Sequence, residues 1–189
     1  MSKITFQKPG NFIYPVPAVM VSLRDASGKS NIITIAWTGT ICSDPAMVSI
    51  SVRKERYSYP MIKETGEFVI NLTTEDLAFA TDYAGVTSGR DVDKWAKLNL
   101  TRVPSDKVAA PYIAESPLAI ECKVTEVKEL GTHDMFIAEV VALHVDDKYM
   151  DEKGAFHLEQ AKPLVYSHGK YFAIGKELGK FGYSIKKEK

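Results

Sequence analysis

Two arginines, Arg53 and Arg56, lie in a short segment that also carries the hydroxyl groups of Ser51 and Ser58. Guanidinium groups bind phosphate oxygens through paired, charge-assisted hydrogen bonds. A phosphate monoester bears about −1.5 to −2 charges at neutral pH, so its site needs cations and donors close together. The segment therefore indicates a site for a phosphorylated ligand. The alternative, which composition alone favours, is a solvated basic turn in which an arginine pairs with Glu55.

The residues before these arginines offer a surface against which a flat ring can lie. Residues 32–41 alternate with the period of two that is typical of a β-strand. One face of this predicted strand carries the larger side chains of Ile33, Ile35, Trp37 and Ile41. The other face carries the smaller ones of Thr34, Ala36, Thr38 and Thr40. Since Ala36 and Gly39 leave room for a ring edge beside the backbone, we expect a flat aromatic ligand that bears a phosphate.

The elements that must position this segment are mostly strands. Strands are predicted over residues 18–23, 32–41, 47–53, 67–72, 118–130 and 135–145, with a last apolar piece over 163–174. Short helices are predicted over residues 59–65, from 73 to about 83, and after Ser88. Gly66 is expected to cap the first helix, and Asp44-Pro45 to form a turn. On the strand from residue 118, Glu121, Lys123 and Thr125 are expected to face water.

This pattern predicts a mainly β protein with short helices. Strands at hairpin spacing favour a closed or nearly closed antiparallel barrel, because closure removes exposed sheet edges. The chain has 189 residues, enough for one domain over residues 1–189 with a substantial core.

Composition argues against several classes of protein. Lys plus Arg equals Asp plus Glu at 24 each, whereas a nonspecific nucleic-acid or membrane-surface binder normally carries a basic excess. Cys42 and Cys122 form no CxxC pair, and the histidines lack metal-ligand spacing, so no metal site is proposed. No signal peptide is evident, and no apolar run approaches the length of a membrane span, about 18 residues. The cytoplasm is the expected compartment.

The order of these motifs resembles the flavin reductase-like family of FMN-binding split barrels, and its flavoredoxin-like branch in particular. The matching residues are Asn31, Thr34, Ala36, Trp37 and Gly39, then Asp44-Pro45, then Ser51, Arg53 and Arg56 to Ser58, then Thr65 to Leu72. The turn Gly131-Thr132-His133 and the segment 163–175 match further on. The resemblance covers most of the chain, from about Pro15 to Gly175, and rests on the order and spacing of the motifs together.

The resemblance implies an FMN-binding split β-barrel that dimerises, with FMN at or near the subunit interface. It implies electron transfer from NADH or NADPH to the flavin and on to an acceptor. The cofactor-binding residues implied are Ala36, Trp37, Thr38, Gly39 and Cys42 near the ring, Ser51, Arg53, Arg56, Tyr57 and Ser58 at the ribityl chain and phosphate, and Asn71 as a further polar contact. His133 is implied on the substrate side, although a solvated turn residue is the plainer interpretation. No catalytic residue is assigned, because the flavin itself supplies the redox chemistry.

Two other functions fit the same sequence. One is an FMN electron carrier that has no nicotinamide activity of its own and serves a redox partner protein. The other is a non-flavin barrel that binds a different phosphorylated ligand or an oligonucleotide, although the net basic charge expected of the latter is missing.

Overall fold

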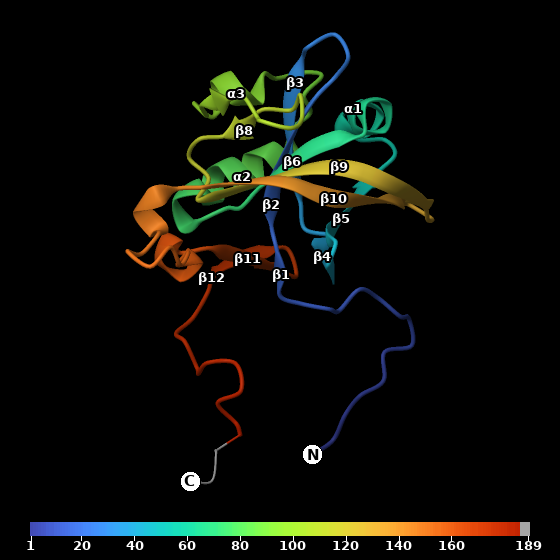
Figure 1. The fold of residues 1–189 in the computed structure, drawn as a ribbon. Coiled ribbons are helices and arrows are strands. Elements are labelled where there is room, and N and C mark those ends of the chain that lie inside the picture. Colours follow the sequence, from blue (N-terminus) through green and yellow to red (C-terminus); the bar gives the residue numbers. More distant parts are fainter. Residues whose placement is uncertain (186–189) are drawn as a thin grey trace.

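The computed structural model describes residues 1–185, and its principal element is a seven-stranded antiparallel sheet (Figure 1). The strands are β2 (Val19–Arg24), β3 (Ser30–Ile35), β4 (Thr38–Ser43), β5 (Ala46–Arg53), β6 (Glu67–Asn71), β9 (Leu118–Glu129) and β10 (His133–Val145). They lie in the order β3-β2-β6-β9-β10-β5-β4. The prediction of a mainly β chain with short helices is confirmed.

The predicted strand over residues 32–41 is wrong in one respect, because it is two strands. β3 ends at Ile35 and β4 begins at Thr38, and these two strands occupy opposite edges of the sheet. The two edges nevertheless lie close together in space, because β3 contacts β5, the neighbour of β4. At Ala36 and Trp37 the chain therefore passes directly from one edge strand to the other. The backbone N–H of Ser51 donates to the carbonyl of Trp37 at 2.8 Å, which holds the crossing segment against β5.

The crossing also changes which side chains are buried. Ile33 and Ile35 lie in the core as expected. Ile41, which was predicted to share their face, is 48% exposed, because it belongs to β4, the strand at the opposite edge of the sheet.

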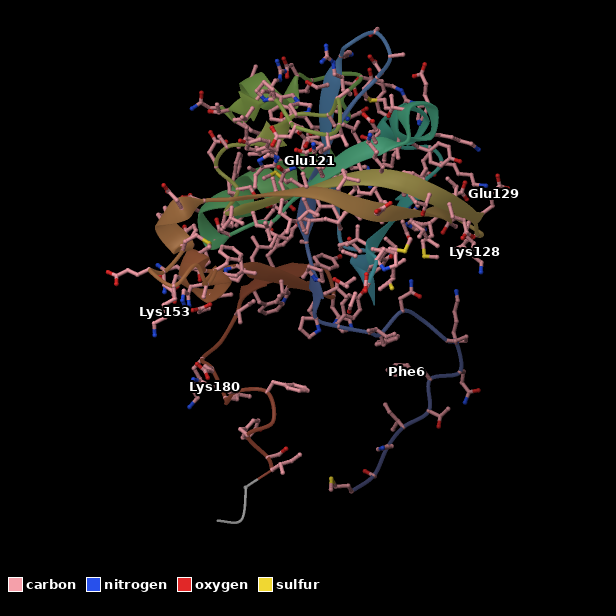
Figure 2. The ribbon with its side chains drawn as sticks, viewed as in Figure 1. Phe6, Glu121, Lys128, Glu129, Lys153 and Lys180 are labelled. Atoms are coloured by element: carbon pink, nitrogen blue, oxygen red, sulfur yellow. The ribbon has the colours of Figure 1, made fainter. Side chains whose placement is uncertain are left out.

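Smaller elements surround the sheet. β1 (Val16–Pro17), β11 (Leu164–Ser167) and β12 (Lys170–Ala173) form a three-stranded sheet, and β7 (Arg102–Val103) pairs with β8 (Tyr112–Ile113). The α-helices are α1 (Ser58–Thr65), α2 (Ala78–Val86) and α3 (Lys94–Lys97). Three 3-10 turns cover Glu75–Leu77, Asp147–Tyr149 and Leu158–Ala161. The segments around Phe6 and Lys180 extend away from the body on the same side (Figure 2).

The end of α1 follows the predicted cap. Gly66 adopts a left-handed conformation with φ of 66°, and its N–H donates to the carbonyl of Ile62. Met61 and Ile62 of this helix are buried in the main core, with Phe68 of β6 and Phe136 of β10. The cap therefore turns the chain directly from α1 into a central strand.

A second apolar cluster covers the outer side of β2 and β3. Met20 and Ile32 pack there against Ala80 and Ala84 of α2 and against Trp95 of α3. β3 is thus covered on both faces, and this packing fixes the two helices beside the strand that leads to the crossing segment.

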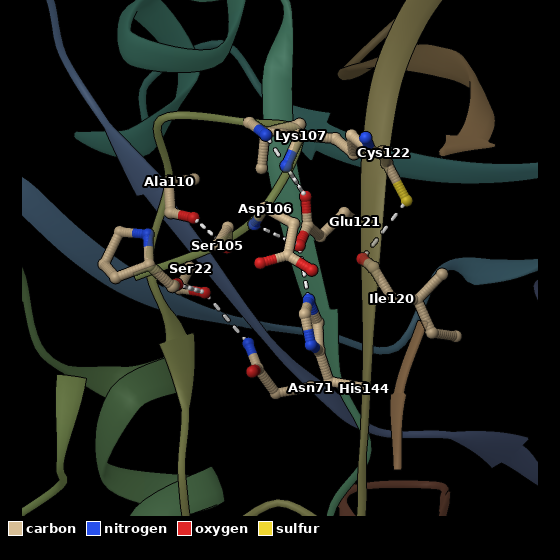
Figure 3. A network of polar contacts seen from close by, with 12 residues as sticks. Ser22, Asn71, Ser105, Asp106, Lys107, Ala110, Ile120, Glu121, Cys122 and His144 are labelled. Carbon is tan, nitrogen blue, oxygen red and sulfur yellow. Dashed lines mark hydrogen bonds and ion pairs between the residues drawn. The ribbon is translucent and has the colours of Figure 1, made fainter. Parts of the chain in front are cut away.

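Glu121 does not face water as predicted. It is fully buried, and its carboxylate accepts hydrogen bonds from the backbone N–H groups of Asp106 (2.8 Å), Lys107 (2.7 Å) and Val108 (3.1 Å). The imidazole of His144 also bonds to it (Figure 3). The loop before β8 covers this face of β9, and these hydrogen bonds hold the pKa of Glu121 below its usual value despite burial.

Among residues 1–185, no helix combines the length and the apolar character needed to cross a bilayer.

We expect Glu121→Ala to lower the free energy of unfolding by at least about 2 kcal/mol, because it leaves several buried N–H groups without an acceptor. Urea unfolding at pH 7 measures the change. Glu126→Ala is the matched control, since Glu126 is exposed on the same strand. Equal unfolding midpoints for the two variants would show that the loop does not depend on this carboxylate.

Candidate cofactor site

Three adjoining cavities form one cleft beside the crossing segment. The apolar cavity, about 540 Å³, is lined by Gly10–Ile13, Val16, Ala36–Thr38, Ser51 and Leu130–His133. The central cavity, about 400 Å³, is lined by Asn11, Ile33–Trp37, Ser51–Arg53, Arg56, Thr132, His133 and Tyr166. The basic cavity, about 300 Å³, is lined by Asn31, Ile33, Arg53, Glu55–Ser58, Thr87–Arg90 and Lys94.

Shared residues make these cavities continuous. Ala36, Trp37 and Ser51 line both the apolar and the central cavity. Arg53 and Arg56 line both the central and the basic cavity. The cleft therefore runs from an aromatic and aliphatic end, past small side chains, to a strongly cationic end.

The two predicted arginines lie at the cationic end with different partners. Arg53 forms an ion pair with Glu55 at 3.3 Å, and both side chains are more than half exposed. Arg56 forms no ion pair within residues 1–185, and it donates to the carbonyl of Gly85 at 3.3 Å. The surface pairing considered as an alternative thus exists for Arg53, yet both guanidinium groups still border the cavity.

Lys94 is a cation of this site that sequence reasoning missed. It is 3% exposed, and its ammonium donates to the carbonyls of Ile32 (2.8 Å) and Ala84 (2.6 Å). No carboxylate pairs with it within the described chain, and an ammonium has three protons, so one donor is left over. Burial and the nearby Arg56 lower the pKa of Lys94 to about 8. An anion in the basic cavity would offset this unpaired charge.

Asn31 and Ser58 form the floor of the basic cavity. The amide of Asn31 donates to the Ser58 hydroxyl at 2.9 Å, and both side chains are buried. Gly89 packs directly against Asn31 and Tyr57, since a Cβ placed there would lie 2.3 Å from Asn31 Oδ1 and 2.8 Å from Tyr57 Cδ1. Only glycine allows the loop before α3 to approach so closely.

A buried carboxylate holds the turn between β9 and β10 at the apolar end. Asp134 is fully buried and accepts from the Tyr59 hydroxyl at 2.6 Å, and Lys54 Nζ lies 3.2 Å from it. These two contacts, the Tyr59 hydrogen bond first, lower the pKa of Asp134. The oxygen that Lys54 contacts, Oδ1, also accepts from the N–H of Leu130 at 3.4 Å. The turn that carries His133 is therefore tied to α1.

His133 lies opposite Arg53 in the pairing of β10 with β5. Burial and the charge of Arg53 lower the pKa of His133, so the imidazole is mainly neutral at pH 7. The hydroxyl of Thr132 is 2.8 Å from its Nδ1. A neutral imidazole held in this way can offer one N–H or one lone pair to a ligand in the apolar cavity.

Comparison with known proteins places this geometry in a family. The model of the flavin reductase-like domain matches residues 11–175. This chain belongs to the flavin reductase-like domain family.

Relatives agree with that assignment over most of the chain. A protein of Archaeoglobus fulgidus without a described function is 33% identical over 144 residues, which cover 75% of this chain and 79% of the relative. The solved flavoredoxin of Desulfovibrio vulgaris (Miyazaki F) is 33% identical with a TM-score of 0.89, covering 97% of this chain and 100% of that one. The flavoredoxin of Methanosarcina acetivorans is 27% identical with a TM-score of 0.88, covering 97% of each chain.

The fold comparison also confirms the predicted split barrel, because solved proteins of that architecture superpose on this flavin reductase-like chain.

Eight of the eleven cofactor residues implied by the resemblance line the cleft: Ala36, Trp37, Thr38, Ser51, Arg53, Arg56, Tyr57 and Ser58.

Three implied residues do not line the three cavities. Asn71 is fully buried, where its amide donates to Met20 O and to Ser22 Oγ (Figure 3) and accepts from the N–H of Ile113. Gly39 and Cys42 lie on β4 beyond Thr38, where Gly39 is exposed and the Cys42 thiol is 3.5 Å from the Asp44 carbonyl. In this flavin reductase-like chain, Asn71 is therefore a structural residue and not a lining residue of the cleft.

Sequence reasoning missed several lining residues that come from distant parts of the chain. They are Asn11 to Ile13, Thr87 to Arg90, Lys94 and Tyr166. The ring of Tyr14 connects two walls, since its centroid is 6.1 Å from that of Trp37 and 6.2 Å from that of Tyr166. Asn31 was part of the matching motif, and this was the one available signal for its place in the site.

One trio in the described chain has metal-ligand chemistry. Asp106, Glu121 and His144 each offer a ligand atom within 4.8 Å of the others. The backbone N–H groups of Asp106, Lys107 and Val108 and the imidazole of His144 already bond to both oxygens of Glu121. We therefore assign Glu121 to holding this loop and not to a metal site.

We expect Asp134→Asn to raise the amide exchange rate of Leu130 and the turn that follows it about tenfold, because the charge-assisted contacts to Tyr59 and Lys54 weaken. Hydrogen exchange followed by mass spectrometry measures this rate. Asp44→Asn, in the exposed turn between β4 and β5, is the control. Unchanged protection in Asp134→Asn would mean that strand pairing alone holds the turn.

Proposed function

We propose that this chain is an FMN-binding oxidoreductase that passes electrons from a reduced nicotinamide, NADH or NADPH, to the flavin and on to an acceptor. The observation that carries the proposal is the continuous cleft with a slot of small and aromatic side chains at one end and four cations at the other. A flavin mononucleotide has the matching shape, with an apolar ring system at one end and a dianionic phosphate at the other.

The phosphate belongs in the basic cavity. Arg53 and Arg56 supply guanidinium donors, Ser58 supplies a hydroxyl, and Lys94 supplies a buried ammonium with one proton unused. Arg90 is a fourth cation on the same wall. Because Lys94 has no carboxylate partner among residues 1–185, a bound dianion would stabilise it, and the donor set therefore fits a phosphate monoester.

The ring system belongs beside the crossing segment. Ala36 and Ser51 are small, so the backbone is accessible there, and Trp37 and Thr38 border the same space. Bound FMN would supply hydride and electron transfer. The chain orients the ring with these residues and shields it from water with the apolar residues Phe12, Ile13 and Leu130.

His133 is proposed on the side of the incoming donor or acceptor. It lines both the apolar and the central cavity, so it can donate a hydrogen bond to a carbonyl or amide oxygen of a molecule placed beside the ring. Its neutral state at pH 7 suits this role, because a cation there would add to the charge of Arg53.

A second candidate function is an FMN electron carrier without nicotinamide activity, which the similarity to two flavoredoxins favours. Anaerobic mixing with NADH and with NADPH separates the two functions: bleaching of the flavin supports the oxidoreductase, and its absence supports the carrier. A protein that stays colourless after FMN is added and the excess removed would instead support another phosphorylated ligand.

The oligomeric state, the cellular compartment and the partner protein are part of the same proposal. We propose a homodimer in the cytoplasm, with a redox protein as a further partner. The exposed apolar side chains of Phe12 and Ile13, which border the apolar cavity, support a second copy near the cleft.

We expect Arg56→Ala to weaken FMN binding about tenfold, since it removes a charge-assisted contact to the phosphate. Equilibrium dialysis of the flavin-free protein against FMN measures the dissociation constant. Lys97→Ala is the control, because Lys97 is an exposed cation of α3 outside the three cavities. Equal retention of FMN by the two variants would show that the phosphate lies elsewhere.

FMN affinity should also fall as the pH rises through about 8, the pKa of Lys94 in the free protein. The dianion favours the charged ammonium, so binding must be accompanied by proton uptake once the free amine is neutral. Between pH 7 and 9 we expect a loss of about tenfold. Lys94→Met should bind more weakly at pH 7 and lose this slope, whereas Lys97→Met should keep it. A slope that persists in Lys94→Met would assign the titration to another group.

A further inference from the structure

The segment that joins β10 to β11, residues 146–163, is drawn in orange in Figure 1. It contains two 3-10 turns, Asp147–Tyr149 and Leu158–Ala161, with a tight loop between them. The segment leads into β11, whose Tyr166 lines the central cavity. Its last residues are tied to the body of the protein, because Lys162 O accepts from the N–H of Glu75 at 3.0 Å. The rest of the segment is ordered mainly by contacts among its own residues.

Asp151 closes the loop between the two turns. Its Oδ1 accepts from the backbone N–H groups of Lys153 (2.9 Å) and Ala155 (2.8 Å), and its own N–H donates to the carbonyl of Ala155 at 2.9 Å. The N–H of His157 donates to the carbonyl of Tyr149 at 2.8 Å. These hydrogen bonds bring His157 back beside Asp151.

The imidazole of His157 has a carboxylate oxygen at each of its two nitrogens. Nε2 lies 3.1 Å from Asp151 Oδ2, and Nδ1 lies 3.0 Å from Glu159 Oε1. An ionised carboxylate can only accept, whereas a neutral imidazole has one N–H and one lone pair. A neutral ring could therefore bond to one carboxylate only, and its lone pair would face the other. Because the imidazolium has two N–H groups, it alone makes both contacts.

The other charged side chains of the segment do not compete for this imidazolium. Asp146 and Lys148 pair with each other, with Nζ 2.7 Å from Oδ2. The remaining charged residues of the segment are exposed: Asp147, Glu152, Lys153 and Lys162. The charged groups that act on His157 are thus the carboxylates of Asp151, from the loop, and Glu159, from the second 3-10 turn.

We propose that Asp151, His157 and Glu159 form a proton-controlled clamp. As an imidazolium, His157 holds the loop at Asp151 against the 3-10 turn at Glu159, and it releases one of the two when it loses its proton. The order of residues 149–162, which lead into β11, then depends on pH. The inference goes beyond the proposed function and does not rest on it, because none of the three residues lines the cleft.

Two protonation equilibria set the pH range of the clamp. The hydrogen bonds to Asp151 and then to Glu159 raise the pKa of His157, although burial acts in the opposite direction. Its contribution to stability is therefore complete below its ordinary pKa of 6.5 and is lost as the pH rises through the raised value. The hydrogen bond to His157 lowers the pKa of Asp151, whose contribution is complete above 3.8 and is lost as the pH falls through the lowered value. The pair is most stable between these two ordinary values.

Histidine titration of the flavin-free full-length protein, followed by NMR, measures the pKa of His157. We expect this pKa to be higher in the folded chain than in the same chain unfolded in urea. It should fall in Asp151→Asn and fall less in Glu159→Gln, because the contact with Asp151 is the larger cause. Glu152→Gln, which removes an exposed carboxylate of the same loop, should leave it unchanged. Equal folded and unfolded pKa values, or a pKa that neither Asp151→Asn nor Glu159→Gln lowers, would overturn the clamp.

Amide exchange separates a clamp from an ion pair that orders nothing. We expect the protection of amides within residues 151–162, corrected for the intrinsic exchange rate at each pH, to fall about tenfold between pH 6 and pH 9. His157→Gln cannot carry the charge, so it should show the lower protection at both pH values. His168→Gln, at the exposed turn between β11 and β12, is the matched control and should keep the fall.

A fall in protection that persists in His157→Gln, or no fall in the parent protein, would overturn the proposal. All of these measurements use the flavin-free protein. Loss of the clamp would therefore leave the proposed function standing, and a failure to bind flavin would leave the clamp standing.

Discussion

The passage of the chain from β3 to β4 at Ala36 and Trp37 determines how the two edges of the sheet are connected and where the cleft lies. Two strands that follow one another in sequence lie at opposite edges of the sheet, so the two residues between them must bridge the edges. The hydrogen bond from Ser51 N to Trp37 O fixes the bridge to the neighbouring strand. Ala36 and Trp37 lie between the two strands and line both the apolar and the central cavity, so the cleft lies beside this bridge.

Electrostatics shapes the far end of the cleft. Arg53, Arg56, Arg90 and Lys94 border one small cavity, and only Arg53 has a carboxylate partner within the described chain. Like charges at such close quarters repel one another, and burial adds to the cost for Lys94. The protein tolerates this arrangement through carbonyl contacts to Lys94, which place the cation without neutralising it. A site of this kind is preorganised for an anion and less stable without one.

Sequence reasoning predicted the features that local patterns determine. The hairpins, the Asp44-Pro45 turn and the Gly66 cap depend on residues close together in the chain. Arg53 and Arg56, which the sequence singled out together, border the same cavity. The break within residues 32–41 was missed, because alternation with a period of two continues through both strands. Glu121 and Asn71 were misplaced because the loop around Lys107 and the two-residue strand β8 with Ile113, which contact them, have no periodicity. Lys94 gave no signal, since a buried lysine and a surface lysine look alike in a sequence.

The close contact of Gly89 with Asn31 and Tyr57 has a consequence for the cavities on either side of it. Gly89 borders both the basic cavity and an adjoining cavity that Gly28–Ser30, Asp91–Asp93 and Arg102 also line. Asn31, Arg90 and Lys94 border both cavities as well. Any side chain at this position would collide with Asn31 and Tyr57. Relatives that carry a larger residue here would have to move this loop outward or reshape the floor beneath it, and the passage would change with it. The absence of a side chain at Gly89 therefore sets how closely this loop approaches β3 and the width of the passage between the two cavities.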